Sequence, residues 1–145
     1  MDSFISIEII WQDPDMVEIL VKASNGKFYG ETEVYTTYPD LVTFASSLEG
    51  FPPSVNDKVT YNAGEKDSYS FASIIIYCFT ASGHTAALVE IEANIASNQR
   101  KEEKHQTKME VQFEIQSLDS FRHKLVSLIT NKSGIAVLHG IQPYT

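Results

Sequence analysis

The amino-acid sequence predicts a single α+β domain, residues 1–145, in which two amphipathic helices pack on a mainly antiparallel sheet of about six to seven strands. Two observations carry this prediction. Several short segments alternate between apolar and polar side chains, which is the period of a half-buried strand. Two other segments repeat apolar residues at intervals of three and four, which is the period of a helix that packs on one side.

The first part of the chain predicts three strands. In residues 5–11, three isoleucines and Trp11 share one face of the first strand. Residues 16–23 and 28–36 form the next two strands. Asn25-Gly26, which lies between them, is typical of a type I′ hairpin turn, because both residue types tolerate positive φ.

Each of the two predicted helices follows a strand. The first, at residues 40–48, comes after Pro39 and ends before Gly50, residues that suit the beginning and the end of a helix. The second, at residues 117–130, has Ser117 as its N-cap. The two apolar stripes have the same spacing, in Leu41, Phe44 and Leu48 and in Leu118, Phe121 and Leu125. This spacing indicates either an internal repeat or the pattern that amphipathic helices share.

The second half of the chain adds further strands, one polar segment and a C-terminal segment. The predicted strands lie at residues 58–61, 69–80, 85–95 and 109–115. Residues 97–106 contain no aliphatic or aromatic side chain and predict an exposed, mobile loop. Residues 131–145 provide either a short edge strand or a loose tail.

Side chains that carry chemistry are dispersed along the sequence. The four histidines are far apart, and the single cysteine, Cys78, lies in an apolar run where a thiol stays protonated. Neither a nucleophile elbow nor a phosphate-binding glycine loop occurs. Ser82 and His84 would need a distant carboxylate to complete a catalytic triad. We therefore predict a protein that is not an enzyme and has no cofactor and no metal site.

Acidic side chains are concentrated before residue 99. Residues 1–98 hold 14 acidic and 4 basic side chains, a balance of −10, whereas residues 99–145 have a balance of +2. Such a surface repels the phosphate backbone, so we expect no nucleic-acid partner, and it attracts a basic protein. The alternative interpretation is that the acidity only keeps the chain in solution.

Two rows of acidic side chains follow predicted strands. Glu31 and Glu33 share a strand face with two tyrosines, and Glu90 shares a face of a later strand with Glu92. Buried acids with unequal pKa values would suit general acid–base catalysis, but exposure on the outer face of a sheet is the expected arrangement. Tyrosine is frequent in interfaces. The predicted partner-binding residues are therefore Tyr29, Glu31, Glu33, Tyr35, Glu90 and Glu92.

Signals for secretion or membrane insertion are missing from the sequence. No apolar run reaches the ~18–20 residues that a membrane span needs. The segment Met1-Asp2-Ser3-Phe4 lacks the positive charge that begins a signal peptide. A single cysteine forms no internal disulfide. We expect a cytoplasmic protein with no membrane partner, and its oligomeric state stays open.

The order of these features resembles the small bacterial immunity proteins of polymorphic toxin systems, in particular the WapI-like kind. The similar features are Gly26-Lys27-Phe28-Tyr29-Gly30 after a strand pair, the helix at 40–48, the strand that ends in Glu90-Ile91-Glu92, the polar loop, and the strand-plus-helix unit at 109–129. The similarity covers about residues 4–130 and is one of arrangement. It implies an inhibitor that binds a cognate toxin, and it assigns no individual residue.

Two functions of different classes follow from the sequence. The first is a non-enzymatic protein-binding domain, an immunity protein that neutralises a basic toxin. The second is a small-molecule-binding or enzymatic domain with a pocket between sheet and helices, suggested by an aromatic content of 11%. A deep pocket lined by polar groups would favour the second function, whereas a solid core would count against it.

Overall fold

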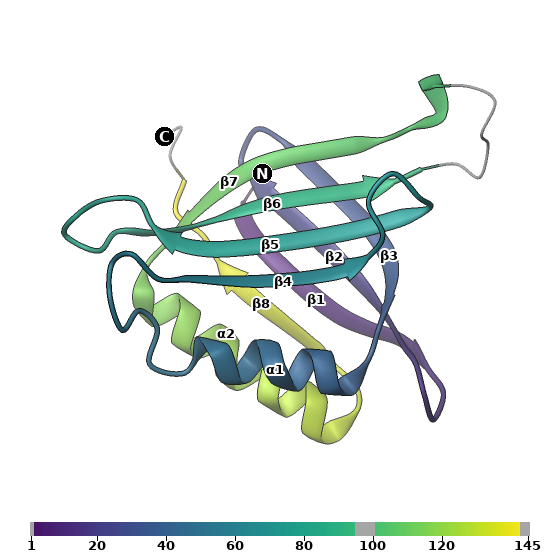
Figure 1. Ribbon diagram of the computed structural model, residues 1–145, viewed down its shortest axis with the longest axis horizontal. Helices are drawn as coiled ribbons and strands as arrows, with labels where there is room; N and C mark the ends of the chain where they lie inside the picture. Colours follow the sequence, from purple (N-terminus) through teal and green to yellow (C-terminus); the bar gives the residue numbers. More distant parts are fainter. Residues whose placement is uncertain (1, 95–100, 143–145) are drawn as a thin grey trace.

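The computed structural model describes residues 2–94 and 101–142, and Figure 1 shows the arrangement of their elements. The strands are β1 (Ser3–Gln12), β2 (Val17–Asn25), β3 (Tyr29–Thr36), β4 (Lys58–Gly64), β5 (Ser70–Cys78), β6 (Thr85–Ala93), β7 (Gln106–Phe113) and β8 (Ile135–His139). The helices are α1 (Tyr38–Leu48), α2 (Ile115–Asn131) and the short 3-10 helix η1 (Lys101–Glu103). No helix in these two ranges is both long enough and apolar enough to span a bilayer.

The strands form two antiparallel sheets of four strands each. Sheet A has the order β3-β2-β1-β8, and sheet B has the order β4-β5-β6-β7. The two sheets cross at an angle, and α1 and α2 lie next to each other along one side of them (Figure 1). The α+β class and the antiparallel strands are thus confirmed, but eight strands in two sheets replace the expected six to seven strands in one.

The extra strand, β8, lies in the segment for which the sequence left two alternatives. Residues 135–139 pair with β1 at the border of sheet A, so this segment contains the edge strand. Directly after β8, the N–H of Gly140 donates to the carbonyl of Ser3 at 2.8 Å, and that of Ile141 donates to Gln112 at 2.8 Å. Ser3 belongs to sheet A and Gln112 to sheet B. The chain after β8 therefore joins the two sheets.

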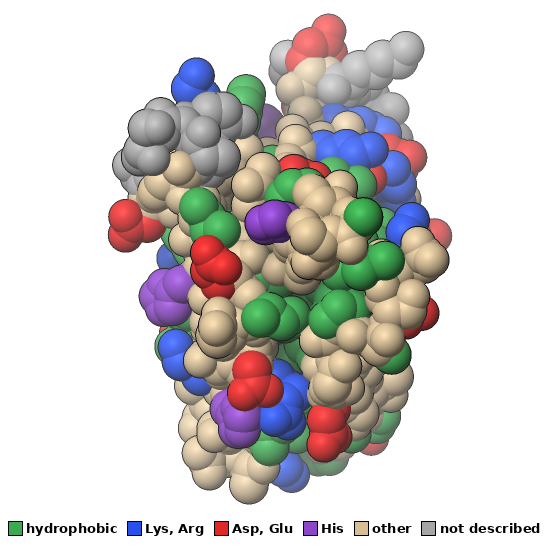
Figure 2. Space-filling model, turned by 90° about the vertical axis from the view of Figure 1, so that its left-hand side faces the viewer, with side chains coloured by type: hydrophobic (Ala, Val, Ile, Leu, Met, Phe, Trp, Pro, Cys, Tyr) green, Lys and Arg blue, Asp and Glu red, His purple; other side chains and the backbone are tan. Residues whose placement is uncertain are grey.

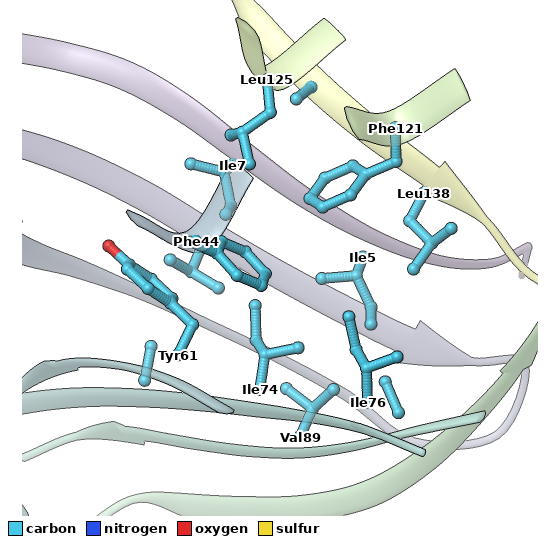
Figure 3. Packing of buried hydrophobic residues seen from close by; sticks show 14 of the residues in the cluster. Ile5, Ile7, Phe44, Tyr61, Ile74, Ile76, Val89, Phe121, Leu125 and Leu138 are labelled. Atoms are coloured by element: carbon cyan, nitrogen blue, oxygen red, sulfur yellow. The ribbon is translucent and has the colours of Figure 1, made fainter. Parts of the chain in front are cut away.

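Apolar side chains from both sheets and both helices meet in one core (Figure 3). Ile5 of β1 and Ile76 of β5 face each other across the space between the sheets and are buried. Phe44 of α1 stacks on Tyr61 of β4 with ring centroids 4.6 Å apart, and it meets Phe121 of α2 edge-on at 6.2 Å. Each such buried aliphatic or aromatic side chain contributes about 1.5–3 kcal/mol to folding.

The first helix ends where the sequence indicates and begins two residues earlier, at Tyr38. Thr37 is its N-cap, and the Thr37 hydroxyl accepts from the Asp40 N–H at 3.2 Å. Pro39 occupies the first turn, where a backbone N–H has no partner within the helix, so the missing N–H of proline costs no hydrogen bond. Gly50, with a φ of +70°, follows the helix. The buried face consists of Leu41, Phe44, Ala45 and Leu48.

The second helix begins earlier than the sequence predicts. Glu114 is the N-cap, and Ser117 already lies in the first turn, where its N–H donates to the Glu114 carbonyl at 2.9 Å. The expectation that Ser117 caps this helix is therefore wrong. The physical reason is that β7 ends at Phe113 and leads into the helix without a loop. Lys132, in the left-handed conformation with a φ of 55°, ends the helix.

The turn between β2 and β3 also differs in type from the expectation. Residues Asn25 and Phe28 close it, with the Asn25 N–H donating to the Phe28 carbonyl at 3.2 Å. Gly26 has a φ of 94°, whereas Lys27 does not have a positive φ. Positive φ at the first central residue alone matches type II′ rather than type I′. The Asn25 side chain supports the turn by accepting from the N–H groups of Lys27 and Phe28.

The predicted mobile loop at residues 97–106 lies partly outside the described residues. Of its described part, residues 101–103 form η1, and Gln106 is the first residue of β7. The N–H of Ala93 donates to the His105 carbonyl at 3.0 Å, so the ladder between β6 and β7 extends toward this segment.

Candidate functional site

Strand β3 is the edge strand of sheet A at the border opposite β8, and every second residue of it faces solvent. The exposed residues are Tyr29, Glu31, Glu33 and Tyr35, and the buried ones are Gly30, Thr32, Val34 and Thr36. Alternation within a strand produces this division, because successive side chains point to opposite faces of the sheet. The structure therefore places four of the six predicted site residues together on one exposed face.

Neighbouring strands extend this face with more acidic side chains. Glu18 of β2 lies opposite Tyr35, and Leu20 lies between Glu33 of β3 and Glu8 of β1. We call this surface the acidic face, and define it by Glu8, Trp11, Glu18, Tyr29, Glu31, Glu33 and Tyr35. Lys22, opposite Glu31, is the only lysine or arginine that the described pairing of sheet A places among them.

A β-bulge brings Trp11 onto the acidic face. Ile9 pairs with Ile19, but Trp11 pairs with Glu18, so β1 contains one residue more than β2 at this point. The extra residue reverses the alternation, and Trp11 turns outward instead of following the three isoleucines inward. The sequence-based placement of Trp11 on their face is therefore wrong. The available signal was the unbroken apolar run Ile9-Ile10-Trp11, which interrupts the alternation.

Two exposed aromatic rings meet at one end of the acidic face. Trp11 is 47% exposed and Tyr35 is 51% exposed. Their ring centroids are 6.2 Å apart with an interplanar angle of 88°, an edge-to-face arrangement. Such pairs are favourable by about 0.5–1.5 kcal/mol beyond their buried area. The contact holds both rings in place while one side of the pair stays open to a partner.

At the other end of the face, Tyr29 donates a hydrogen bond from its hydroxyl to Glu31 Oε1 at 2.6 Å. Partial burial, with smaller effects from this hydrogen bond and the charge of Glu31, raises the pKa of Tyr29 to about 12. Tyr29 therefore stays neutral at physiological pH. The Glu31 carboxylate is oriented along the strand and keeps a second oxygen for a partner.

The other two predicted site residues lie on sheet B, and one of them is buried. Glu92 is 2% exposed and accepts from the Asp67 N–H at 2.8 Å and from Asn94 Nδ2 at 3.3 Å. The expectation that Glu92 forms part of an exposed acidic row is wrong, because the turn between β4 and β5 folds over it. Asn94 helps to hold this turn, since its N–H donates to the Tyr69 carbonyl at 2.8 Å.

Glu90 is partly exposed, but its charge is matched by two lysines. Its carboxylate lies 3.1 Å from Lys66 Nζ and 3.6 Å from Lys108 Nζ. Because both neighbours are basic, Glu90 adds no net negative field to the surface of sheet B. Glu90 and Glu92 therefore do not join the acidic face, either in position or in charge.

The histidine in the β5–β6 turn does not form a catalytic triad. His84 Nδ1 lies 2.8 Å from Thr80 Oγ1 and 3.1 Å from Ser82 Oγ. A triad needs one imidazole nitrogen on the nucleophile and the other on a carboxylate. In the described parts of the chain no hydrogen bond or ion pair joins His84 to a carboxylate, and both hydroxyls share the same nitrogen. This geometry indicates a polar turn.

Hydrophobic side chains are exposed at the end of the molecule from which the β5–β6 turn projects (Figure 2). Phe79, Ile115 and Ile141 line a cavity of about 140 Å³ there, together with His84. Within residues 2–94 and 101–142, no group of three or more His, Cys, Asp or Glu side chains has an arrangement that could hold a metal ion.

Buried apolar side chains point into the interior between sheets and helices, as Figure 3 shows for Phe44, Phe121 and Ile74. One groove of about 270 Å³ lies between the helices and is lined by Val42 and Val126, which are exposed residues. This groove is therefore on the outer surface of the helix pair, and it differs from the pocket between sheet and helices that the second sequence-based function requires.

The acidic face gathers four of the six predicted site residues. It is an open sheet surface with three aromatic side chains and four glutamates, and it suits contact with another macromolecule better than enclosure of a small molecule. Comparisons of the chain with protein-family models, with curated proteins and with solved structures found no match.

Proposed function

We propose that this chain is a non-enzymatic protein-binding domain and that the acidic face binds a basic protein. The observation that supports this most directly is the exposed Trp11–Tyr35 pair beside Glu18. Aromatic side chains that are held in place are the residues that most often dominate binding energy in interfaces. The surrounding glutamates would attract a partner of opposite charge and fix its orientation.

The specific form of the proposal is an immunity protein that neutralises a basic toxin in the cytoplasm. The net charge of −8 and the likeness in arrangement to WapI-like immunity proteins support this form. A toxin that acts on nucleic acid carries a basic surface toward its substrate. An acidic sheet surface would cover that region and thereby block the substrate.

The proposal is tested by measuring partner binding after charge reversal. The purified chain is used to isolate a basic partner from the cells that encode it, and the dissociation constant is then measured with the purified partner. We expect the double substitution Glu31→Lys and Glu33→Lys to weaken binding by at least about 100-fold, since charge pairs across interfaces contribute about 1.5 kcal/mol or more each. The ratio between the dissociation constants of the double variant and the wild type should decrease as salt is added, because salt screens the charges.

A matched control changes the net charge equally at another place. Glu49 and Asp57 are exposed and lie on the connection from α1 to β4, away from sheet A. Replacing both with lysine should leave the dissociation constant within about three-fold of the wild-type value. Equal weakening by the two double variants, or no weakening by either, would show that the acidic face is not the binding surface.

A further inference from the structure

The hydrogen-bonding pattern of the β2–β3 hairpin determines which backbone groups of β3 lie at the border of sheet A. Asn25 and Phe28 form a hydrogen-bonded pair where the hairpin closes. In an antiparallel ladder, hydrogen-bonded and non-hydrogen-bonded pairs alternate. With the observed register, the non-hydrogen-bonded pairs are Ser24–Tyr29, Lys22–Glu31, Leu20–Glu33 and Glu18–Tyr35. The N–H and C=O groups of these four β3 residues therefore point away from β2.

No other segment of the described chain occupies this border. Strand β4 lies near β3 but belongs to sheet B, and β3 pairs only with β2 (Figure 1). In residues 2–94 and 101–142, none of the backbone hydrogen bonds outside the regular ladders involves Tyr29, Glu31, Glu33 or Tyr35. Each of them thus presents one donor and one acceptor at an open edge. The same four residues present their side chains on the acidic face.

We propose that the partner binds by adding an extended strand to this edge, antiparallel to β3, so that sheet A gains a fifth strand. The inference rests on the proposed function and specifies how the partner is recognised. Backbone hydrogen bonds to an exposed edge provide affinity, and alternate side chains provide specificity. In antiparallel pairing, the partner residues opposite Glu31 and Glu33 project onto the acidic face, so these residues are lysine or arginine.

Charge distinguishes a basic partner from a second copy of this chain. If two copies paired antiparallel along the whole of β3, Glu31 of one copy would lie directly opposite Glu33 of the other. Like charges directly opposite each other destabilise a strand pair. Acidic side chains on an edge strand therefore disfavour self-association while they favour a basic strand. The charges of Glu31 and Glu33 thus both keep the edge free of a second copy of the chain and select a basic strand.

The test uses the full chain and three synthetic peptides of eight residues, in which lysine alternates with threonine or valine. The first peptide is unmodified. The second is N-methylated at the lysine residues, whose N–H groups would face β3. The third is N-methylated at the threonine and valine residues, whose N–H groups would face away. All three have the same charge, so only the position of the missing donors distinguishes them.

We expect the unmodified and the third peptide to bind with dissociation constants within about three-fold of each other, and the second to bind at least about ten-fold more weakly. The first should also slow hydrogen exchange of the amides of Tyr29, Glu31, Glu33 and Tyr35. Equal binding by all three peptides, or binding by none, would overturn strand addition. So would a dimer of the free chain with these amides already protected.

The failure of strand addition differs from the failure of the proposed function. The charge-reversal experiment changes side chains and leaves every backbone donor in place. If reversal weakens the partner but N-methylation of the lysines has no effect, the acidic face binds through side chains alone and strand addition is wrong. If reversal itself has no effect, the proposed function is wrong.

Discussion

Glu90 and Glu92 show how two like residues on one strand acquire different roles. Both project from the same face of β6, as alternation predicts, but only Glu92 is covered by the β4–β5 turn. Glu90 is left between two lysines. Alternation specifies the face on which a side chain lies, and it contains no information on what a distant turn does to that face. The long-range contact between Glu92 and the Asp67 N–H therefore determines that Glu92 is buried.

Replacement of Glu92 should destabilise the fold. Glu92→Ala removes the acceptor of the Asp67 N–H, and an unsatisfied buried polar group costs about 1–3 kcal/mol. Glu90→Ala, the matched control on the same strand, should cost about 0–1 kcal/mol because it breaks only partly exposed ion pairs. Urea unfolding followed by circular dichroism measures both values. Equal losses in the two variants would contradict the structural role of Glu92.

On the acidic face, the sequence predicted the members on β3 but missed those on β1 and β2. Tyr29, Glu31, Glu33 and Tyr35 obey strict alternation within a regular strand, so their common face follows directly from the period. Trp11 depends on a bulge, which changes the face by insertion of a single residue. Glu18 depends on which strands become neighbours. Neither the bulge nor the choice of neighbouring strands can be predicted from the residues next to Trp11 or Glu18 in the sequence.

At the level of elements, the β4–β5 hairpin is constrained by a glycine with little space around it. Gly64, with a φ of +76°, ends β4, and a Cβ added there would lie 2.3 Å from the Ser70 carbonyl oxygen and 2.7 Å from Val34 Cγ2. The polar sequence Gly64-Glu65-Lys66-Asp67 is typical of a turn. The need for glycine arises from the close approach of β5 and of β3, which belongs to the other sheet.

Gly64→Ala should therefore destabilise the chain more than Gly50→Ala. Gly50 has a similar φ of +70°, but a Cβ there would meet nothing within 4 Å. The Gly50 variant experiences backbone strain alone, about 1–2 kcal/mol, whereas the Gly64 variant adds a steric clash with backbone. We expect a difference of at least about 1 kcal/mol in the free energy of unfolding measured with urea. A Gly50 variant as unstable as the Gly64 variant would contradict this.

For the whole molecule, the sequence predicted the class of the fold but not the division into two sheets. The strand segments were recognisable by their period, yet a period does not reveal the partner of a strand. Strands β3 and β4 are separated by α1 and do not pair, and this break in the ladder creates the second sheet. The sequence did not decide between an edge strand and a tail for residues 131–145, because a five-residue strand such as β8 has too few residues to show alternation clearly.

Tyr61 connects the two sheets, and its ionisation should lower the stability of the fold at alkaline pH. Its hydroxyl donates to Thr36 Oγ1 at 2.8 Å, from β4 of sheet B to β3 of sheet A. Burial, with a further effect of the Asp40 charge, raises the pKa of Tyr61 to about 12. The folded chain therefore holds the phenolic proton more strongly than the unfolded chain, whose ordinary pKa is 10.0.

The sign of the effect follows from this difference in proton affinity. Below pH 10 both states of the chain are protonated at Tyr61, and the stabilisation is fully present. Between about pH 10 and pH 12 only the unfolded state loses the proton, so the free energy of unfolding falls by about 1.4 kcal/mol per pH unit. The stability advantage of wild type over Tyr61→Phe, measured by urea unfolding, should shrink by about 2–3 kcal/mol across this range. Parallel pH profiles would contradict the assignment.

Strand β1 lies inside sheet A, between β2 and β8, and this position has a consequence for biosynthesis. Of the strands in the two sheets, β1 is translated first and β8 last. The backbone groups of β1 that pair with β8, from Phe4 to Glu8, therefore have no partner until the ribosome has passed His139. A nascent or truncated chain that ends before β8 exposes this side to pairing with other chains. Sheet A is therefore complete only after β8 has been synthesised, and until then aggregation competes with folding.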